Sequence, residues 1–141
     1  MPDAGRDSIF MKIVKGEIPC HRVFENDHVL AFLDITPLSA GHTLVVPKRP
    51  VERFEELSPE EAAEIARQLG GIAKRVLAAT GAEAYNILQN NGKVSGQEVP
   101  HVHFHIIPRR AGDGLGYRWK AKPADQNELA ELARRINAAE A

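Results

Sequence analysis

The sequence predicts an α+β fold in which five short strands form an antiparallel sheet and one long helix packs on one face of it. The first observation is a long stretch, residues 58–81, with apolar residues at helical spacing between a start signal and a stop signal. The second is a set of short apolar segments separated by turn residues, which is typical of strands. The predicted strands cover residues 21–25, 29–35, 41–47, 84–89 and 101–108.

The long helix is expected to begin at Ser58, whose side chain can cap the first turn, and Glu61 completes a capping box. Pro59 suits the first turn of a helix, and Gly81 suits its end. The pair Gly70-Gly71 should weaken this helix or mark close packing against the sheet. The residues expected to face the core repeat at helical spacing and are Ile65, Leu69, Ile72 and Val76.

Two shorter helices are expected near the ends of the chain. Asp7 or Ser8 can cap an N-terminal helix that ends at Gly16. Asp125 forms a second capping box with Glu128 and starts a C-terminal helix, which we expect to pack on the sheet or to cap a dimer. The apolar face of that helix consists of Leu129, Leu132 and Ile136.

Length, charge and cysteine content limit the possible functions. The 141 residues indicate one domain, residues 1–141, with a modest core. The net charge of −1 provides no general attraction to nucleic acid or to an anionic membrane, so neither is expected as a partner. Cys20 is the only cysteine, which is compatible with a reducing compartment. Because the chain shows no signal sequence and no membrane-spanning apolar run, we expect a cytoplasmic protein.

Three of the six histidines lie at alternate positions within residues 101–105. In an extended strand, His101, His103 and His105 line one face, and the apolar residues between them line the other. Such a row is costly to keep unless it has a function. One interpretation is a half-buried strand whose polar face happens to be histidine.

The two functional interpretations of the row are a metal site and a catalytic site. Two of the histidines can share a zinc ion, but His101 and His105 lie about 13 Å apart in a strand, so the three cannot easily bind one ion. A metal would therefore need ligands from elsewhere. The alternative is a nucleophilic imidazole whose neighbours orient it and hold an anion. We place catalysis ahead of metal binding, and metal binding ahead of a purely structural strand.

Further motifs precede the histidine row, which is itself followed by two apolar residues. They are Ser8-Ile9-Phe10, Ala31-Phe32-Leu33-Asp34-Ile35, Gly41-His42-Thr43-Leu44-Val45-Val46-Pro47-Lys48, Asn90-Asn91-Gly92 and Ser95-Gly96-Gln97. In order and approximate spacing they resemble the histidine triad (HIT) family of nucleotide hydrolases and transferases, and most of all its bacterial nucleotide-binding, phosphoramidase-like branch. The resemblance covers about residues 7–110, leaves residues 111–141 as a C-terminal tail and helix, and implies a HIT-like fold.

The resemblance also implies where a nucleotide binds. Asp34 would accept hydrogen bonds from both ribose hydroxyls, whereas spacing alone would make it a turn cap. His42 would support the triad from behind. The residues expected near the base are Phe10, Ile13, Phe32 and Ile35, of which Phe10 and Ile13 could equally be core residues.

Residues 90–98 form a turn-rich loop that would by itself be read as a plain connector. Because it comes just before the histidine row, its amides and polar side chains would lie near an anion held by His103. By resemblance, Asn90 and Gln97 contact the phosphate and the leaving group. Glu98 belongs to the same group, although close relatives often carry serine or threonine there, which weakens the case for a hydroxyl-based proton relay.

The mechanism implied by the resemblance is nucleotidyl transfer to His103, followed by hydrolysis. The carbonyl group of His101 would accept the proton on one ring nitrogen of His103, while the other nitrogen attacks the α-phosphorus. His105 would contact the nonbridging oxygens. Relatives that transfer the nucleotidyl group to another phosphate carry glutamine at the position of His105, so histidine there favours hydrolysis.

The expected substrates are purine nucleoside phosphoramidates, such as adenylated amines, with AMP or GMP as the product. Dinucleoside polyphosphates are the alternative within the enzyme class. A second class is a nucleotide-binding or interaction module whose turnover is incidental, and a third is a metal-binding protein. Relatives form two-fold dimers, so a homodimer is expected.

No cofactor is expected, and no structural zinc. Family members with structural zinc carry cysteines at the positions of Ser8 and Met11, and neither side chain replaces a thiolate. His42 and His101 would supply the other two ligands in such members, and both are present in this chain. Without the cysteine pair, a closed tetrahedral site is not expected to form.

Overall fold

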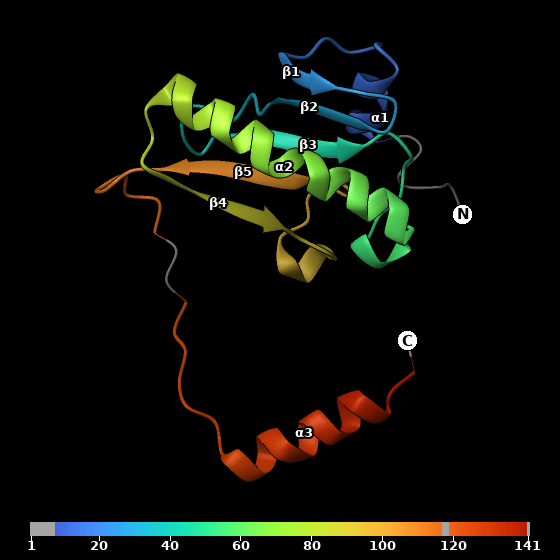
Figure 1. Cartoon of the computed structure of the whole chain (residues 1–141), viewed down its shortest axis with the longest axis vertical. Coiled ribbons are helices and arrows are strands. Elements are labelled where there is room, and N and C mark those ends of the chain that lie inside the picture. Colours follow the sequence, from blue (N-terminus) through green and yellow to red (C-terminus); the bar gives the residue numbers. More distant parts are fainter. Residues whose placement is uncertain (1–7, 117–118, 141) are drawn as a thin grey trace.

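The computed structural model describes residues 8–116 and 119–140 (Figure 1). Its elements are, in chain order, α1 (Ile9–Val14), β1 (Arg22–Glu25), β2 (Val29–Leu33), β3 (Thr43–Pro47), α2 (Pro59–Thr80), β4 (Ala84–Gln89), β5 (Phe104–Arg109) and α3 (Gln126–Ala138). Short 3₁₀ turns lie at Phe54–Glu56 and Lys93–Ser95. The predicted α+β class is confirmed, with five strands, one long helix and a shorter helix towards each end.

The strands form one antiparallel sheet in the order β1-β2-β3-β5-β4. Strands β1 and β2 form a hairpin, and the side chain of Asn26 accepts hydrogen bonds from the backbone N–H groups of His28 and Val29. Because every neighbouring pair is antiparallel, β2 and β4 run in opposite directions. The chain therefore leaves β2 and β4 at opposite ends of the sheet, on either side of the central pair β3 and β5.

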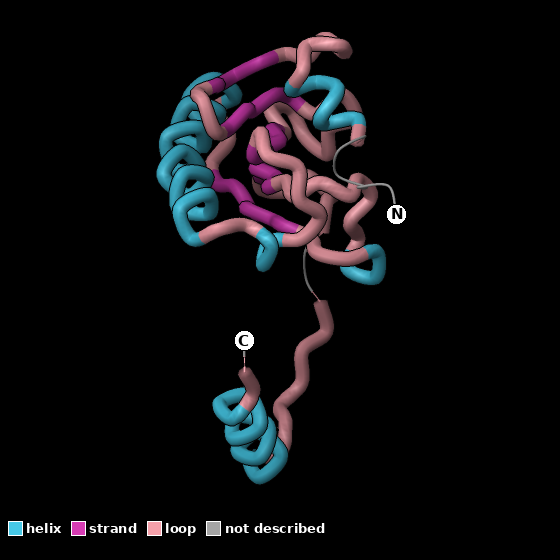
Figure 2. The backbone as a smooth tube through the Cα atoms, turned by 90° about the vertical axis from the view of Figure 1, so that its right-hand side faces the viewer, coloured by secondary structure: helices cyan, strands magenta, loops and turns pink. Residues whose placement is uncertain are grey.

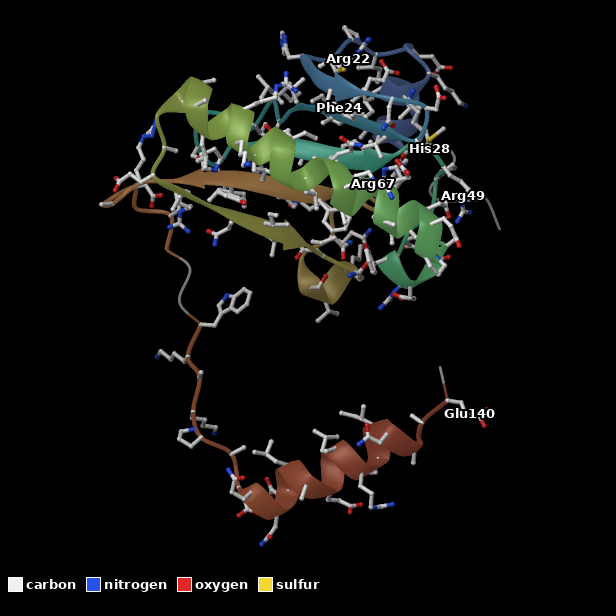
Figure 3. All side chains as sticks on the ribbon, in the orientation of Figure 1. Arg22, Phe24, His28, Arg49, Arg67 and Glu140 are labelled. Atoms are coloured by element: carbon white, nitrogen blue, oxygen red, sulfur yellow. The ribbon has the colours of Figure 1, made fainter. Side chains whose placement is uncertain are left out.

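Helix α2 has the predicted caps. The Ser58 hydroxyl accepts from the Glu61 amide, the Glu61 carboxylate accepts from the Ser58 amide, and Gly81 ends the helix with a left-handed φ of 71°. Arg49, at the start of α2 (Figure 3), also binds both carboxylate oxygens of Glu61, and this contact lowers the pKa of Glu61 to about 2. The predicted stripe packs on the core, with Leu69 partly buried. Space is open around Gly70 and Gly71, so the expectation of close packing there is wrong.

Both faces of the central strands are covered, as Figure 2 shows: α2 lies along one face, while α1 and the loops lie over the other. Alternation along β2 separates the two sides, because Val29 and Ala31 belong to the core under α2, whereas Leu30 and Phe32 belong to the core under α1. Ser8, one of the two residues predicted to cap this helix, is the N-cap of α1. Phe10, on α1, is buried in this second core.

The histidine row is not a single strand, contrary to the prediction. Strand β5 begins at Phe104, and residues 101–103 are irregular backbone that leads into it. The alternation of faces nevertheless holds, because Val102, Phe104 and Ile106 all pack in the core under α2. The reason for the irregular start is local: the Val102 amide donates to the Val51 carbonyl and the His101 amide to the Val99 carbonyl, so neither amide enters the ladder.

Helix α3 does not pack on the sheet, so the first of the two alternatives predicted for it is wrong. Every described residue of α3 is exposed, and the helix stands apart from the sheet in both Figure 1 and Figure 2. Asp125 caps it by accepting from the Glu128 amide, but the Glu128 carboxylate makes no return bond to the Asp125 amide, so the predicted capping box is only half formed. Its apolar residues Leu129, Leu132 and Ile136 are therefore available to a partner. Among the described helices, none has the length and apolar content that crossing a membrane requires.

Candidate active site

A pocket of about 390 Å³ opens over the start of β5. Seven of the residues predicted to form the site line it: Phe10, Asp34, His42, Asn90, Glu98, His103 and His105. The other lining residues, to which the sequence analysis gave no individual role in the site, are Thr36, Leu38, Leu44, Leu88, Gly96 and Val99. The remaining predicted residues, Ile13, Phe32, Ile35, Gln97 and His101, do not line the pocket.

His103 is held in one orientation and one tautomer. Its Nδ1 lies 2.7 Å from the carbonyl oxygen of His101, and because a carbonyl only accepts, Nδ1 carries the proton and donates it. The lone pair is therefore on Nε2. The edge of Phe10 packs against the ring at 4.9 Å between centroids, and the His105 ring lies at the same distance. Burial lowers the pKa of His103, so the ring is neutral near pH 7.

His101 is fully buried, and its backbone carbonyl accepts the hydrogen bond from His103. Its Nε2–H donates to the carbonyl of Pro47 at 2.8 Å, which leaves Nδ1 to accept from the Ser8 hydroxyl at 3.2 Å. The Ser8 oxygen in turn accepts from the Met11 amide as the N-cap of α1. These bonds connect α1, the end of β3 and the carbonyl group that orients His103. Burial lowers the pKa of His101.

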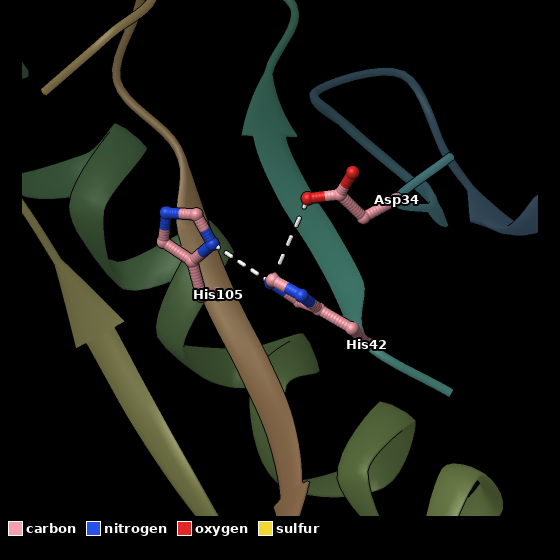
Figure 4. A group of neighbouring side chains, drawn as sticks. All are labelled: Asp34, His42 and His105. Atoms are coloured by element: carbon pink, nitrogen blue, oxygen red, sulfur yellow. Dashed lines mark hydrogen bonds and ion pairs between the residues drawn. The ribbon is translucent and has the colours of Figure 1, made fainter. Parts of the chain in front are cut away.

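His42 and His105 form a second hydrogen-bonded pair (Figure 4). The backbone N–H of Leu38 donates to Nδ1 of His42 at 3.0 Å, so the proton of a neutral His42 is on Nε2. That nitrogen lies 2.9 Å from Nδ1 of His105 and donates to it. His105 must then carry its own proton on Nε2, which makes it a hydrogen-bond donor. Burial lowers the pKa of both rings, and for His105 the value falls to about 4.

Asp34 stands beside this pair, and its structure supports two roles. One carboxylate oxygen accepts from both the amide and the hydroxyl of Thr36, as a turn cap does. The other oxygen lies 3.7 Å from Nε2 of His42, which is too long for a hydrogen bond. The second oxygen is thus available to a ligand. Ile35 is 81% exposed and does not line the pocket, so of these two neighbouring predicted residues Asp34 alone does.

The loop of residues 90–98 is held by one buried side chain. The Gln97 side chain accepts from the Gly92 amide at 2.7 Å and donates to the Glu52 carbonyl at 2.7 Å. Its oxygen and its nitrogen therefore each bind a backbone group. The position of Gly92 itself depends on a φ of 92°, which favours glycine. Asn90, Gly96 and Glu98 reach the pocket from this loop. Gln97 therefore shapes the loop in this structure without lining the pocket.

Two groups of described side chains come into question as metal sites. Asp34, His42 and His105 have ligand atoms within 4.8 Å of one another. A metal on Nε2 of His42 would need the proton on Nδ1, where the Leu38 amide already donates, so we assign this group to hydrogen bonding. The second group is the one that the family resemblance gives for structural zinc. At its cysteine positions this chain has Ser8 and Met11, and the Ser8 hydroxyl is hydrogen-bonded to Nδ1 of His101 and to the Met11 amide, so these residues do not fit a zinc ion.

Sequence reasoning missed two contributions to the site. The first is the Leu38 amide, which sets the tautomer of His42, and a backbone group of a turn leaves no signature in residue type. The second is the link from Ser8 to His101, which spans 93 positions of the chain. The capping signal identified Ser8 but did not indicate its second partner.

The HIT domain family model matches residues 15–112. An uncharacterized HIT-like protein of Methanocaldococcus jannaschii is 56% identical over 124 residues, covering 86% of this chain and 94% of its own length. An adenosine 5'-monophosphoramidase of Schizosaccharomyces pombe is 47% identical over 130 residues, covering 92% of this chain and 95% of its own length. A solved structure of a HIT family member from Bacillus subtilis superposes with a TM-score of 0.90 at 37% identity, covering 96% of this chain and 98% of that one.

These matches extend over most of the chain and over most of each relative. The fold, with a triad placed at the start of the strand next to β3, defines a protein of the histidine triad class. The chain belongs to the HIT family, which confirms the resemblance seen in the sequence. The relative with a named activity supports a nucleotide hydrolase of the HIT type.

Proposed function

We propose that this chain hydrolyses purine nucleoside 5'-phosphoramidates, with a covalent nucleotidyl-histidine at His103, and releases the nucleoside monophosphate. The observation that carries the proposal is the bond from Nδ1–H of His103 to the His101 carbonyl at 2.7 Å. It leaves the lone pair of a neutral imidazole on Nε2 of a residue that lines the pocket. Such a nitrogen is a nucleophile without the need for a separate base.

The reaction proceeds in two displacements at phosphorus. In the first, Nε2 of His103 attacks the α-phosphorus, a nitrogen–phosphorus bond forms, and the bond from phosphorus to the amine breaks. The amine leaves with its electron pair and takes up a proton. In the second, water attacks the same phosphorus, the bond to Nε2 breaks, and the water proton is released. The products are the monophosphate, the amine and an unchanged His103.

His105 stabilises the charge that develops on the nonbridging oxygens. The Leu38 amide donates to His42, and His42 donates to Nδ1 of His105. The Nε2–H of His105 therefore remains available as a donor. A neutral donor fixed before the substrate arrives needs no reorganisation during the reaction. The hydrogen bond between His42 and His105 supports this proposed role of His105.

The remaining predicted contacts keep the roles that the family resemblance implies. We propose that the second oxygen of Asp34 accepts from the ribose and that Phe10 lines the base side of the pocket. Asn90 and Glu98 face the phosphate and the leaving group, and Gln97 acts by holding their loop. Ile13, Phe32 and Ile35 complete the base side, although in this structure they do not line the pocket.

The test is to trap the intermediate. Enzyme mixed with an adenylated amine and quenched in acid-free denaturant should show an adenylyl adduct on His103 by peptide mass spectrometry. The His103→Ala variant should lose both the adduct and turnover, while the exposed His28→Ala control keeps both. Turnover by His103→Ala at the rate of the parent protein would overturn the proposal, and retained nucleotide affinity with no turnover in either protein would favour a binding module.

We also propose that the whole chain acts as one domain in a cytoplasmic homodimer whose substrate is a small nucleotide rather than nucleic acid or a membrane. The lone Cys20 and the net charge of −1 support the location and the substrate class. Exposed apolar residues support the dimer: Tyr85 and Ile87 on the edge strand β4, and Leu129, Leu132 and Ile136 on α3. Light scattering of the full chain at several concentrations measures the assembly.

A further inference from the structure

The charges that line the catalytic pocket are unusual for a phosphate site. The two charged side chains among its described lining residues are Asp34 and Glu98, and both are acidic. The other polar side chains of the lining are Thr36, Asn90 and three histidines, at positions 42, 103 and 105, and burial lowers the pKa of each histidine. The histidines are therefore neutral near pH 7, and the charged groups of the described lining are the two carboxylates.

The two carboxylates reach the pocket from opposite ends of the sheet. Asp34 follows β2, whereas Glu98 belongs to the connection that follows β4, and these strands run in opposite directions on either side of β3 and β5. His103 and His105 lie at the start of β5, between them. A ligand whose nucleoside lies on the Asp34 side therefore extends its leaving group from phosphorus towards Glu98.

The Glu98 carboxylate is also free to act on a ligand. Its side chain is exposed, and no hydrogen bond or ion pair joins it to another residue within the described parts of the chain. Asp34, in contrast, uses one oxygen on Thr36. Glu98 is thus the one pocket carboxylate with neither oxygen committed to a described residue.

We propose that Glu98 selects the leaving group by charge, so that the site prefers conjugates whose leaving group is neutral or cationic, such as amines, over anionic phosphate, sulfate or carboxylate-bearing groups. This inference rests on the proposed function and narrows its substrate class. An anionic leaving group would bring a second negative charge next to Glu98 without a lysine or arginine in the described lining to offset it. A cationic tail would be attracted by the same carboxylate.

The size of the effect follows from distance and exposure. Two unit charges about 5 Å apart in surroundings of intermediate dielectric constant change a rate or binding constant by roughly tenfold. Because Glu98 is exposed, salt screens part of this, and the effect should shrink as ionic strength rises through about 0.5 M. A purely steric role for the side chain would show no such salt dependence.

The experiment uses three adenosine phosphoramidates of equal tail length. They carry the same phosphorus–nitrogen bond, and their tails end in an ammonium, a methyl or a carboxylate group. The full chain should hydrolyse them in that order of kcat/KM, with about tenfold between neighbours. In Glu98→Gln, which keeps the shape and removes the charge, the ammonium-to-carboxylate ratio should fall at least tenfold. Glu83→Gln, the matched charge change before β4, should keep the ratio of the parent protein.

The outcomes separate this inference from the function on which it rests. If no substrate is hydrolysed and no adduct forms on His103, the proposed function fails. If all three are hydrolysed through His103 but Glu98→Gln leaves the ratio within twofold of the parent value, the inference about Glu98 is wrong while the function stands. A ratio that changes equally in Glu83→Gln would also overturn it, because the effect would then reflect net charge.

Discussion

The hydroxyl oxygen of Ser8 lies 3.2 Å from Nδ1 of His101, across 93 positions of the chain. The same oxygen caps α1 by accepting from the Met11 amide. Since the carbonyl of His101 holds Nδ1–H of His103, the cap of a six-residue helix is connected through one ring to the proposed nucleophile.

Replacement of Ser8 by alanine should therefore reduce both stability and turnover. The lost cap and the unpaired Nδ1 of buried His101 should cost about 1–3 kcal/mol of unfolding free energy. We expect kcat to fall about three- to tenfold, with little change in KM, because His103 loses orientation rather than a substrate contact. Denaturant unfolding and steady-state kinetics measure the two effects.

The matched control is Ser58→Ala, which removes the corresponding cap of α2 but touches no histidine. It should lose about 1 kcal/mol of stability and keep its kcat. Equal losses of kcat in the two variants would mean that Ser8 acts only through general stability.

Replacement of His42 by alanine should slow the reaction, although His103, the proposed nucleophile, is left in place. His105 would lose the donor on its Nδ1, and its proton would no longer be held on Nε2. We expect kcat to fall about 10- to 100-fold, the range of a weakened oxyanion donor. The adduct on His103 should still form, more slowly, and rapid-quench kinetics would detect it. His21→Ala, at an exposed position, should behave as the parent protein, and an unchanged kcat in His42→Ala would contradict the relay.

Stability should fall as the pH falls below about 6.5, the ordinary pKa of histidine. Burial lowers the folded-state pKa of four histidines at positions 42, 101, 103 and 105, the last to about 4. Below pH 6.5 the unfolded chain therefore binds protons that the folded chain does not, so the stabilisation present at higher pH is lost on acidification. Each such histidine contributes up to about 1.4 kcal/mol per pH unit.

Urea unfolding at pH 7.5, 6 and 5 measures this slope. His105→Asn should make it shallower, and the exposed His28→Asn should leave it unchanged. A stability that is flat or that rises between pH 7.5 and 5 would show that these rings are not held neutral by burial.

Two glycines should respond to alanine in opposite directions. At Gly41 the φ is +92°, and a Cβ would lie 2.7 Å from the Thr80 side chain, so Gly41→Ala should destabilise by about 2–4 kcal/mol and disturb the neighbouring His42. At Gly70 nothing lies within 4 Å of a Cβ, so Gly70→Ala should stabilise by about 0.5–1 kcal/mol. Thermal unfolding of the two variants checks both signs, and a stabilised Gly41→Ala would contradict the structure at this turn.

Local signals in the sequence were enough for most of the fold. Short apolar segments between turn residues identified the strands, and the capping signals near Ser8, Ser58 and Asp125 identified the helix starts. The prediction for the start of the last strand failed because the backbone there is held by a residue that is distant in the sequence. The start of β5 moved to Phe104 because the Val102 amide is taken by the Val51 carbonyl, and nothing near residue 102 indicates that partner.

The sequence by itself determined which residue types carry the chemistry: a histidine at every second position of one segment, an acid after β2 and a polar loop before the triad. Residue type and spacing are local properties, so they can be read directly. Only the tertiary structure decided which nitrogen of each histidine holds the proton. That choice depends on Ser8, Pro47, Leu38 and the His101 carbonyl, whose positions relative to the rings result from packing α1 and the β2–β3 turn against the sheet.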